Sequence, residues 1–239
     1  MESITDLING IRSGQTAYGR MNRIQYLPYK MDVALSVVEK IAQTIDPKFK
    51  MIEEVSEVYK ELIRYFHADP EFKGDLTKGI LLMGPTGTGK TIAMQIMSIY
   101  RQIDDTKFVC HGKLYRMNYE VIDVNRLVAL FMENAFDGVE IYCRRYVTCL
   151  DDIGTEDKSV KYYGNVLDVV GHVIAERYSK GLLTFGTTNF PLNVLEEMYD
   201  DRIISRMHAM FNFMTLKCED FRRKKKKVNN ANSPVFKTT

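Results

Sequence analysis

The chain has 239 residues, of which 45% are hydrophobic, and a formal net charge of +2. This length and apolar fraction fit one ordinary globular domain with an extension and exclude a disordered protein. No uncharged apolar run reaches the roughly 20 residues that cross a bilayer, and the polar N-terminus lacks a secretory signal, so we expect a cytoplasmic protein without membrane contact.

The N-terminal third of the chain is predicted to be helical, with an interruption at Pro28. Apolar residues between positions 51 and 66 recur at helical spacing, and charged residues occupy the other side, which predicts an amphipathic helix. We expect this helix to pack on the remainder of the protein. Residues 1–48 are the better candidates for contacting a partner, within a helical extension that we place at residues 1–75.

Short apolar runs alternate with longer amphipathic stretches from residue 76 to residue 222. Strands are predicted at 80–83, 120–123, 146–150, 182–185 and 211–216. Helices are predicted at 91–101, 124–131, 162–179, 192–199 and 201–207. This alternation indicates a parallel α/β sheet covered by helices on both faces. The remaining residues, 223–239, form a basic tail that has almost nothing to bury and is expected to be disordered.

A glycine-rich segment follows the first of these strands and matches the pattern G-x-x-x-x-G-K-[ST]. Its residues are Gly84, Pro85, Thr86, Gly87, Thr88, Gly89, Lys90 and Thr91. Glycines allow backbone N–H groups to turn inward around a phosphate, and the next helix directs its positive dipole end at the same anion. We expect Lys90 to reach the β- and γ-phosphates of ATP and the Thr91 hydroxyl to bind Mg²⁺. The segment therefore predicts a nucleotide-binding P-loop.

Two aspartates end the mostly apolar strand predicted at 146–150. Because α/β sheets bind ligands where their parallel strands end, Asp151 and Asp152 are expected beside the P-loop. Asp151 would bind Mg²⁺, directly or through water, and Asp152 would orient or deprotonate the attacking water. Asn189, after the next strand, can reach the γ-phosphate or this water from the other side. The alternatives are a solvated acidic turn for the two aspartates and an ordinary loop residue for Asn189.

Two arginines, Arg202 and Arg206, lie one turn apart in a segment predicted to be helical, so they share one helix face. Guanidinium groups on one face can bind phosphate, or they can form surface ion pairs with nearby acids. The nearby acids are Glu197, Asp200 and Asp201. Helical spacing alone favours the surface ion pairs.

Four motifs in order, GPTGTGKT, CLDDIG, TTN and RIISRM, resemble those of the DnaC/IstB branch of AAA+ ATPases, the bacterial and phage helicase loaders and transposase helpers. The resemblance covers roughly residues 78–223 and implies a P-loop NTPase fold with an AAA+ core. It also implies that Arg206 acts in trans on ATP held by a neighbouring subunit, with Arg202 as its supporting partner. The resemblance thus reverses the preference for surface ion pairs.

The resemblance further implies that Arg222 senses bound nucleotide in cis. The sequence departs from the family pattern just before this residue, where Cys218 and Asp220 replace the usual glycine and serine. Asp152 also stands where many AAA+ proteins have glutamate. A shorter carboxylate at that position implies slow hydrolysis, which suits a switch better than a motor.

The resemblance implies three kinds of partner: copies of the chain in a ring or spiral, single-stranded DNA, and a replicative helicase or transposase bound by the N-terminal helices. The basic candidates for DNA contact are residues 124–126, residues 143–146 and the basic tail. Tyr142 is an aromatic candidate for stacking on bases. For Arg144 and Arg145 a solvated turn is an equal alternative, and for the tail a solvated chain end.

Three functions remain open for an enzyme that uses ATP and Mg²⁺. The first is a replicative helicase loader with DNA-dependent ATPase activity, and the second is a transposition helper with the same core and a different client. The third is a P-loop kinase for a small acceptor. A kinase would need an arginine-rich lid and an acceptor pocket, neither of which the sequence identifies, and Asp152 with Asn189 favours water as the acceptor.

Overall fold

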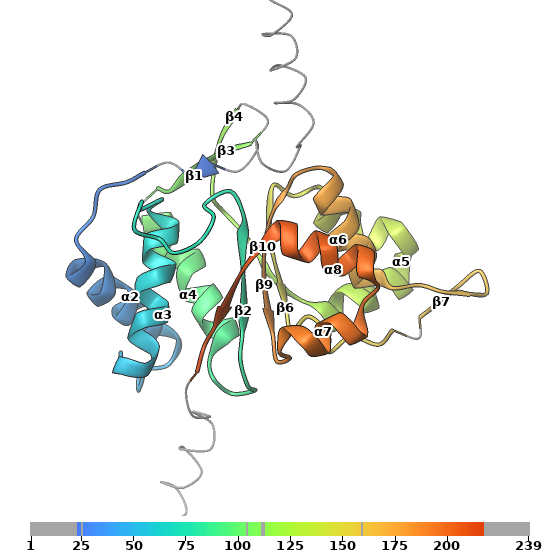
Figure 1. The fold of residues 1–239 in the computed structure, drawn as a ribbon, viewed down its shortest axis with the longest axis horizontal. Coiled ribbons are helices and arrows are strands. Elements are labelled where there is room, and N and C mark those ends of the chain that lie inside the picture. The colour runs from blue at the N-terminus through green and yellow to red at the C-terminus, as the bar shows by residue number, and fades with distance from the viewer. Residues whose placement is uncertain (1–22, 25, 104, 111–112, 159, 218–239) are drawn as a thin grey trace, which may run out of the picture.

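The computed structural model describes residues 23–24, 26–103, 105–110, 113–158 and 160–217 (Figure 1). The predictions for the basic tail, for Arg222 and for residues 1–22 of the helical extension lie outside these residues. Within the described ranges, no helix is both long enough and apolar enough to cross a membrane.

Five parallel strands form the central sheet, in the order β10-β2-β9-β6-β5. Their bounds are Gly79–Met83 (β2), Val121–Asp123 (β5), Val147–Asp151 (β6), Leu183–Thr188 (β9) and Phe211–Thr215 (β10). The sequence predicted all five, and β9 runs further than predicted because its pairing with β2 continues to Thr188. Since the strands share one direction, β2, β6 and β9 end at the same edge, at the bottom of Figure 1.

Helices cover both faces of the sheet, as the alternation of elements predicted. Their bounds are Met31–Ile45 (α2), Glu53–Phe66 (α3), Lys90–Ile103 (α4), Val124–Arg144 (α5), Val169–Ser179 (α6), Leu192–Met198 (α7) and Asp201–Met210 (α8). In Figure 1, α2, α3 and α4 lie on one side of the sheet, and α5, α6, α7 and α8 lie on the other. This is a three-layer α/β arrangement.

Each face of the sheet has its own hydrophobic core. Successive side chains of a strand point to opposite faces, so Ile80 and Leu82 of β2 enter one buried cluster and Leu81 enters the other. The first cluster also contains Leu62 and Phe66 of α3, both fully buried. The apolar stripe of α3 therefore packs on the sheet, as the sequence predicted for this helix.

The helix predicted at 162–179 is wrong in its first part. The chain instead forms an antiparallel hairpin, with β7 at Lys161–Tyr162 and β8 at Asn165–Val166. Tyr163 and Gly164 connect the strands with φ angles of 47° and 82°, the left-handed conformation that tight hairpin turns require. Helix α6 begins only at Val169, after Asp168 caps it by accepting a hydrogen bond from the backbone N–H of Gly171.

Two further features differ from the predictions. Helix α5 extends far beyond residue 131, and it contains a break at Asn134 and Ala135, where Ala135 has a φ of 52°. A small antiparallel sheet, not predicted, consists of Arg23–Ile24 (β1), Lys107–Cys110 (β3) and Lys113–Arg116 (β4). Its strands are short, and β1 lies far from β3 in the sequence. Local residue patterns therefore did not predict these strands or their pairing.

The packing of α3 gives a prediction about stability. We expect Leu62→Ala to lower the free energy of unfolding by about 2–5 kcal/mol, because it removes a fully buried side chain and leaves a cavity between α3 and the sheet. Leu114→Ala is the matched control, since Leu114 is 55% exposed. Urea unfolding measures both variants, and equal losses would contradict the assignment of α3 to the core.

Candidate nucleotide-binding site

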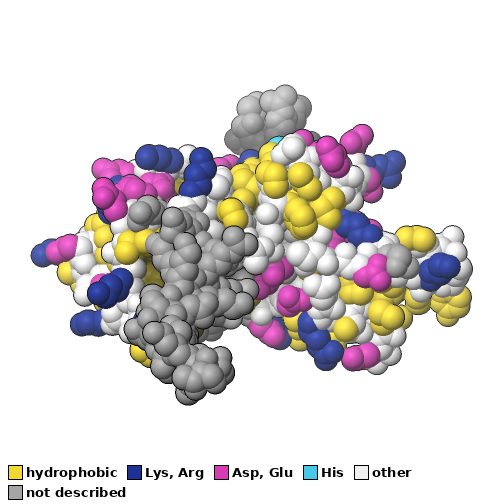
Figure 2. All heavy atoms as spheres, turned by 90° about the horizontal axis from the view of Figure 1, so that it is seen from below, with side chains coloured by type: hydrophobic (Ala, Val, Ile, Leu, Met, Phe, Trp, Pro, Cys, Tyr) yellow, Lys and Arg dark blue, Asp and Glu magenta, His cyan; other side chains and the backbone are white. Residues whose placement is uncertain are grey.

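The predicted P-loop joins the end of β2 to the start of α4, at the edge where the parallel strands end. Gly87 and Gly89 have φ angles of 85° and 89°, a conformation that side chains with a Cβ rarely adopt. An ideal Cβ at Gly89 would meet nothing within 4 Å, so the loop leaves open space there. Figure 2 views this edge from below Figure 1, and acidic side chains lie near its middle.

The ammonium group of Lys90 lies inside this loop. Lys90 is buried, and its Nζ donates to the carbonyl oxygens of Gly84 and Pro85 at 2.8 and 2.9 Å. Nζ also donates to Oδ1 of Asn189, at 2.8 Å. Lys90 and Asn189 are 99 positions apart in the chain, and the structure brings them together.

The Asp151 carboxylate joins three elements at the end of β6. Its Oδ1 accepts a hydrogen bond from the Thr91 hydroxyl on α4 at 2.9 Å and one from the Thr187 hydroxyl on β9 at 2.6 Å. Burial raises the pKa of Asp151, the hydrogen bonds from Thr187 and Thr91 lower it, and the charges of Asp152 and Asp123 raise it further. The net result is a pKa above that of an ordinary aspartate.

Asp152 follows in the left-handed conformation, with a φ of 60°. Its backbone N–H donates to Oγ1 of Thr187 at 2.9 Å, and its carboxylate Oδ1 accepts from Nδ2 of Asn189 at 3.1 Å. Aspartate and asparagine tolerate this conformation better than other residues with a side chain, because their short polar groups bond locally. The backbone therefore gives a physical reason for aspartate rather than glutamate at this position.

Thr187 is a site residue that the sequence analysis did not single out. It is fully buried, and its hydroxyl contacts both Asp151 and the backbone of Asp152. Thr187 falls on the same strand face as Leu183 and Phe185, which belong to the hydrophobic core. A hydroxyl at a core-facing position of an apolar strand was the signal available in the sequence.

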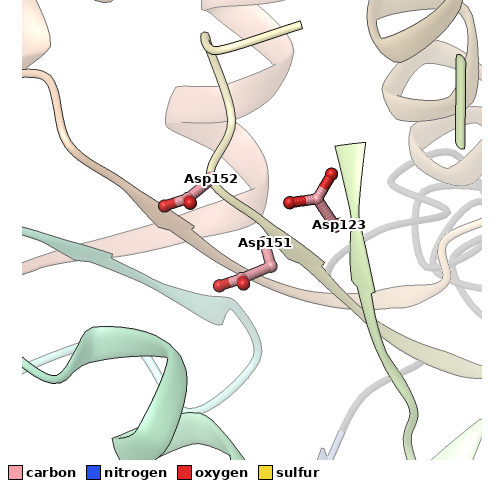
Figure 3. A group of neighbouring side chains, drawn as sticks. All are labelled: Asp123, Asp151 and Asp152. Carbon is pink, nitrogen blue, oxygen red and sulfur yellow. The ribbon is translucent and has the colours of Figure 1, made fainter. Parts of the chain in front are cut away.

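Asp123 is the second residue that was missed. It ends β5, pairs in register with Asp151, and caps α5 by accepting hydrogen bonds from the backbone N–H groups of Asn125 and Arg126. Figure 3 shows its carboxylate beside those of Asp151 and Asp152, and one oxygen from each lies within 4.8 Å of the others. A strand that ends in aspartate next to the Asp-Asp strand was its sequence signal.

The oxygen atoms at the start of α4 and the end of β6 suit Mg²⁺. This ion prefers oxygen ligands in an octahedron at about 2.1 Å, which places neighbouring ligands about 3 Å apart. The Thr91 hydroxyl and Asp151 Oδ1 are 2.9 Å apart. The spacing of these two groups therefore fits adjacent positions around one ion, and the Mg²⁺ site stays a prediction.

The two arginines of α8 lie away from these contacts. Arg202 is exposed, and the guanidinium of Arg206 lies 5.8 Å from the centre of the Tyr178 ring on α6. Among the described residues neither arginine forms an ion pair, so the surface ion pairs favoured by helical spacing are absent. A role in trans for Arg206 stays a prediction.

The candidate DNA contacts are only partly exposed. Tyr142 is 7% exposed, so the expectation that it stacks on bases is wrong: its ring is needed in the core beside α6. Three basic candidates form surface ion pairs, Arg126 with Glu133, Arg144 with Glu140 and Arg145 with Glu120. Surface ion pairs of this kind are weak, so they leave these arginines able to exchange partners.

Comparison with known proteins shows the fold. A primosome component from Streptococcus pyogenes serotype M3 is 18% identical with a TM-score of 0.51, over 71% of this chain and 82% of that one. DnaI is also 18% identical with a TM-score of 0.51, over 82% of this chain and 94% of its own. A DNA replication initiation factor is 15% identical with a TM-score of 0.50, over 79% and 55%. The chain has the P-loop AAA+ fold that its motifs implied.

Curated sequences match a shorter part of the chain. The ATP-dependent zinc metalloprotease YME1L1 of Homo sapiens and of Mus musculus is 25% identical over 149 residues, which is 59% of this chain. The chain spans about a fifth of the length of these relatives, since the match covers 19% of the human protein and 20% of the mouse protein. No model of a known protein family matches the chain.

The buried Asp151 carboxylate gives a prediction about pH. Because the pKa of Asp151 is raised in the folded state, the folded protein holds this proton more tightly than the unfolded chain. The stability from this group is therefore present at low pH and is lost as pH rises through the folded-state pKa. We expect Asp151→Asn to lack this loss, so its free energy of unfolding rises relative to that of the wild type as pH increases.

Urea unfolding of the nucleotide-free proteins, from about pH 4 to pH 7, tests this expectation. Asp137→Asn is the matched control, because it removes an exposed carboxylate from α5. If the curves of wild type and Asp151→Asn run parallel across this range, the assigned effect of burial is wrong.

Proposed function

We propose that this protein is an AAA+ ATPase that acts on DNA as a replicative helicase loader of the DnaC kind, with ATP and Mg²⁺ in the site described above. The observation that carries the proposal is the convergence of Lys90, Asp151, Asp152 and Asn189 at one edge of the sheet. A phosphate loop beside two carboxylates and an amide matches the needs of phosphoryl transfer to water.

The proposed chemistry assigns a task to each group. Backbone N–H groups of the P-loop and the ammonium of Lys90 bind the phosphates of ATP. Mg²⁺, held by Thr91 and Asp151, would neutralise charge on those phosphates. Asp152 accepts a proton from the attacking water, and Asn189, which already bonds Asp152, orients that water.

Self-association completes the proposed site. Arg206 forms no ion pair among the described residues and lies on a partly exposed helix, so a neighbouring subunit's ATP can approach it. A guanidinium that reaches the γ-phosphate from the next subunit stabilises the charge of the transition state, and Arg202 on the same face supports it. Hydrolysis then depends on assembly into a ring or spiral. Arg222 is proposed to sense the nucleotide bound to its own subunit.

DNA and a client protein are the remaining partners of the proposal. Single-stranded DNA would neutralise Arg126, Arg144 and Arg145 in place of their surface glutamates, and the N-terminal residues 1–48 would bind a replicative helicase. The likeness to a primosome component and to DnaI supports this by analogy of fold. A transposition helper with the same core and a transposase as its client is the alternative, and a small-molecule kinase is a distant third.

The experiment that tests the proposed function measures ATP turnover across a range of protein concentrations, with and without single-stranded DNA. Turnover per subunit that rises with protein concentration and with DNA supports a shared active site. Turnover that is flat in both variables would contradict it. Transfer of phosphate to a small acceptor in place of water would favour the kinase.

The buried ammonium group gives a prediction about ATP binding. We expect Lys90→Ala to weaken ATP affinity by about 100-fold or more, because it removes the buried charge that faces the phosphates. Lys217→Ala is the control, since Lys217 is exposed beyond β10. Titration with a fluorescent ATP analogue measures both, and unchanged affinity in Lys90→Ala would contradict the assignment of the P-loop.

The arginine of α8 gives a different prediction. We expect Arg206→Ala to bind ATP normally and to lower turnover by about a thousandfold, because the lost guanidinium acts on the transition state of a neighbour's ATP. Arg116→Ala, which changes an exposed arginine on β4, is the matched control. Wild-type turnover in Arg206→Ala would show that the trans role is wrong.

A further inference from the structure

A buried glutamate lies in the loop that follows Asp152. The side chain of Glu156 is 1% exposed, and its two carboxylate oxygens bond different parts of the protein. Oε2 accepts from the backbone N–H of Gly154 at 2.8 Å, within the same loop. Oε1 accepts from the hydroxyl of Tyr199, which lies 43 positions further along the chain at the end of α7.

Lys158 also approaches Glu156, and its own side chain is 28% exposed. Its ammonium lies 3.8 Å from Oε1 of Glu156, donates to the carbonyl oxygen of Met198 at 2.6 Å, and sits 3.1 Å from the centre of the Tyr199 ring. Burial and the carboxylate of Glu156 raise the pKa of Tyr199, so its hydroxyl keeps its proton and remains a donor. The loop after Asp152 is therefore fixed to the corner between α7 and α8 by charged hydrogen bonds.

Each end of this connection is close to a proposed functional residue. At one end, the backbone N–H and the hydroxyl of Thr155 both donate to the carbonyl oxygen of Asp152, at 3.1 and 2.8 Å. At the other end, Tyr199 precedes Asp200, which caps α8 by accepting from the N–H of Ile203. Helix α8 then presents Arg206.

Packing alone does not explain a carboxylate in this place. A buried carboxylate with charged partners adds little net stability compared with apolar side chains of similar volume, because desolvation offsets the attraction. Its bonds do restrict geometry, since Oε1 and Oε2 accept from donors on different segments. Such a link can carry a shift of one segment to the other where both segments have two arrangements.

We propose that Glu156 and Tyr199 are positioning residues that couple nucleotide binding beside the Asp152 loop to the placement of α8. The placement of α8 in turn sets the position of Arg206 relative to a neighbouring subunit. This inference rests on the proposed function for the role of Arg206. The coupling itself lies within one subunit, so it can be measured without hydrolysis. Loss of the Tyr199 hydroxyl should uncouple α8 from the ATP site.

The test compares wild type with Tyr199→Phe, which removes only the hydroxyl that bonds Glu156. Amide hydrogen exchange is followed with and without a non-hydrolysable ATP analogue, on protein kept monomeric by dilution. In wild type we expect the analogue to slow exchange at the start of α4 and to change exchange in α8. In Tyr199→Phe we expect the response of α4 to remain and that of α8 to be lost.

Turnover provides a second readout at assembling concentrations. We expect Tyr199→Phe to lower turnover by about 2- to 30-fold in the wild-type background and to have no further effect in Arg206→Ala. Tyr163→Phe is the matched control, because it removes a hydroxyl from a tyrosine that is 88% exposed. Glu156→Met, which removes both acceptor oxygens at a similar side-chain volume, is a second variant and should behave as Tyr199→Phe does.

The outcomes separate this inference from the proposed function. If the analogue protects α4 and α8 responds equally in wild type and both variants, or in none of them, the coupling is wrong while ATP binding stands. An equal loss of turnover from Tyr199→Phe in the wild-type and Arg206→Ala backgrounds would also overturn it, since the effect would not pass through Arg206. Absence of protection at α4 would instead refute the proposed nucleotide site.

Discussion

The buried carboxylate of Asp151 is the interaction on which the arrangement of the site depends. Its hydrogen bonds from Thr91 and Thr187 join the P-loop helix, β6 and β9 at one point. A carboxylate removed from water needs such donors, and here they are side chains of two other elements that meet at this edge of the sheet. The parallel register of the sheet makes this possible, because it brings the ends of β2, β9 and β6 together in space.

The constraint continues into the loop that follows. Asp152 adopts a left-handed conformation. The Thr187 hydroxyl accepts a hydrogen bond from the backbone N–H of Asp152, and the Asn189 amide donates one to its carboxylate. In this position a short carboxylate is favoured, because it bonds locally while the backbone stays left-handed. In the proposed function, the connection from Glu156 to Tyr199 carries a change at the ATP site to α8.

Much of the sheet and of the site could be predicted from the sequence, because buried parallel strands are short apolar runs and the P-loop has a fixed pattern. The hairpin around Tyr163 and Gly164 was missed because its apolar residues also fit helical spacing, and turn chemistry decided the outcome. Thr187 and Asp123 could not be assigned to the site without the order of the strands, which local patterns do not give. The group that Arg206 is proposed to contact lies on another copy of the chain, so patterns within one sequence do not identify it.

A mixture of two inactive variants tests whether the active site is shared between subunits. Asp152→Asn removes the carboxylate that accepts the proton but keeps Arg206, whereas Arg206→Ala keeps an intact nucleotide site. We expect each variant alone to hydrolyse ATP poorly and an equal mixture to regain turnover, because mixed assemblies contain interfaces with both groups. A mixture no more active than its separate components would contradict a catalytic arginine supplied by the neighbouring copy.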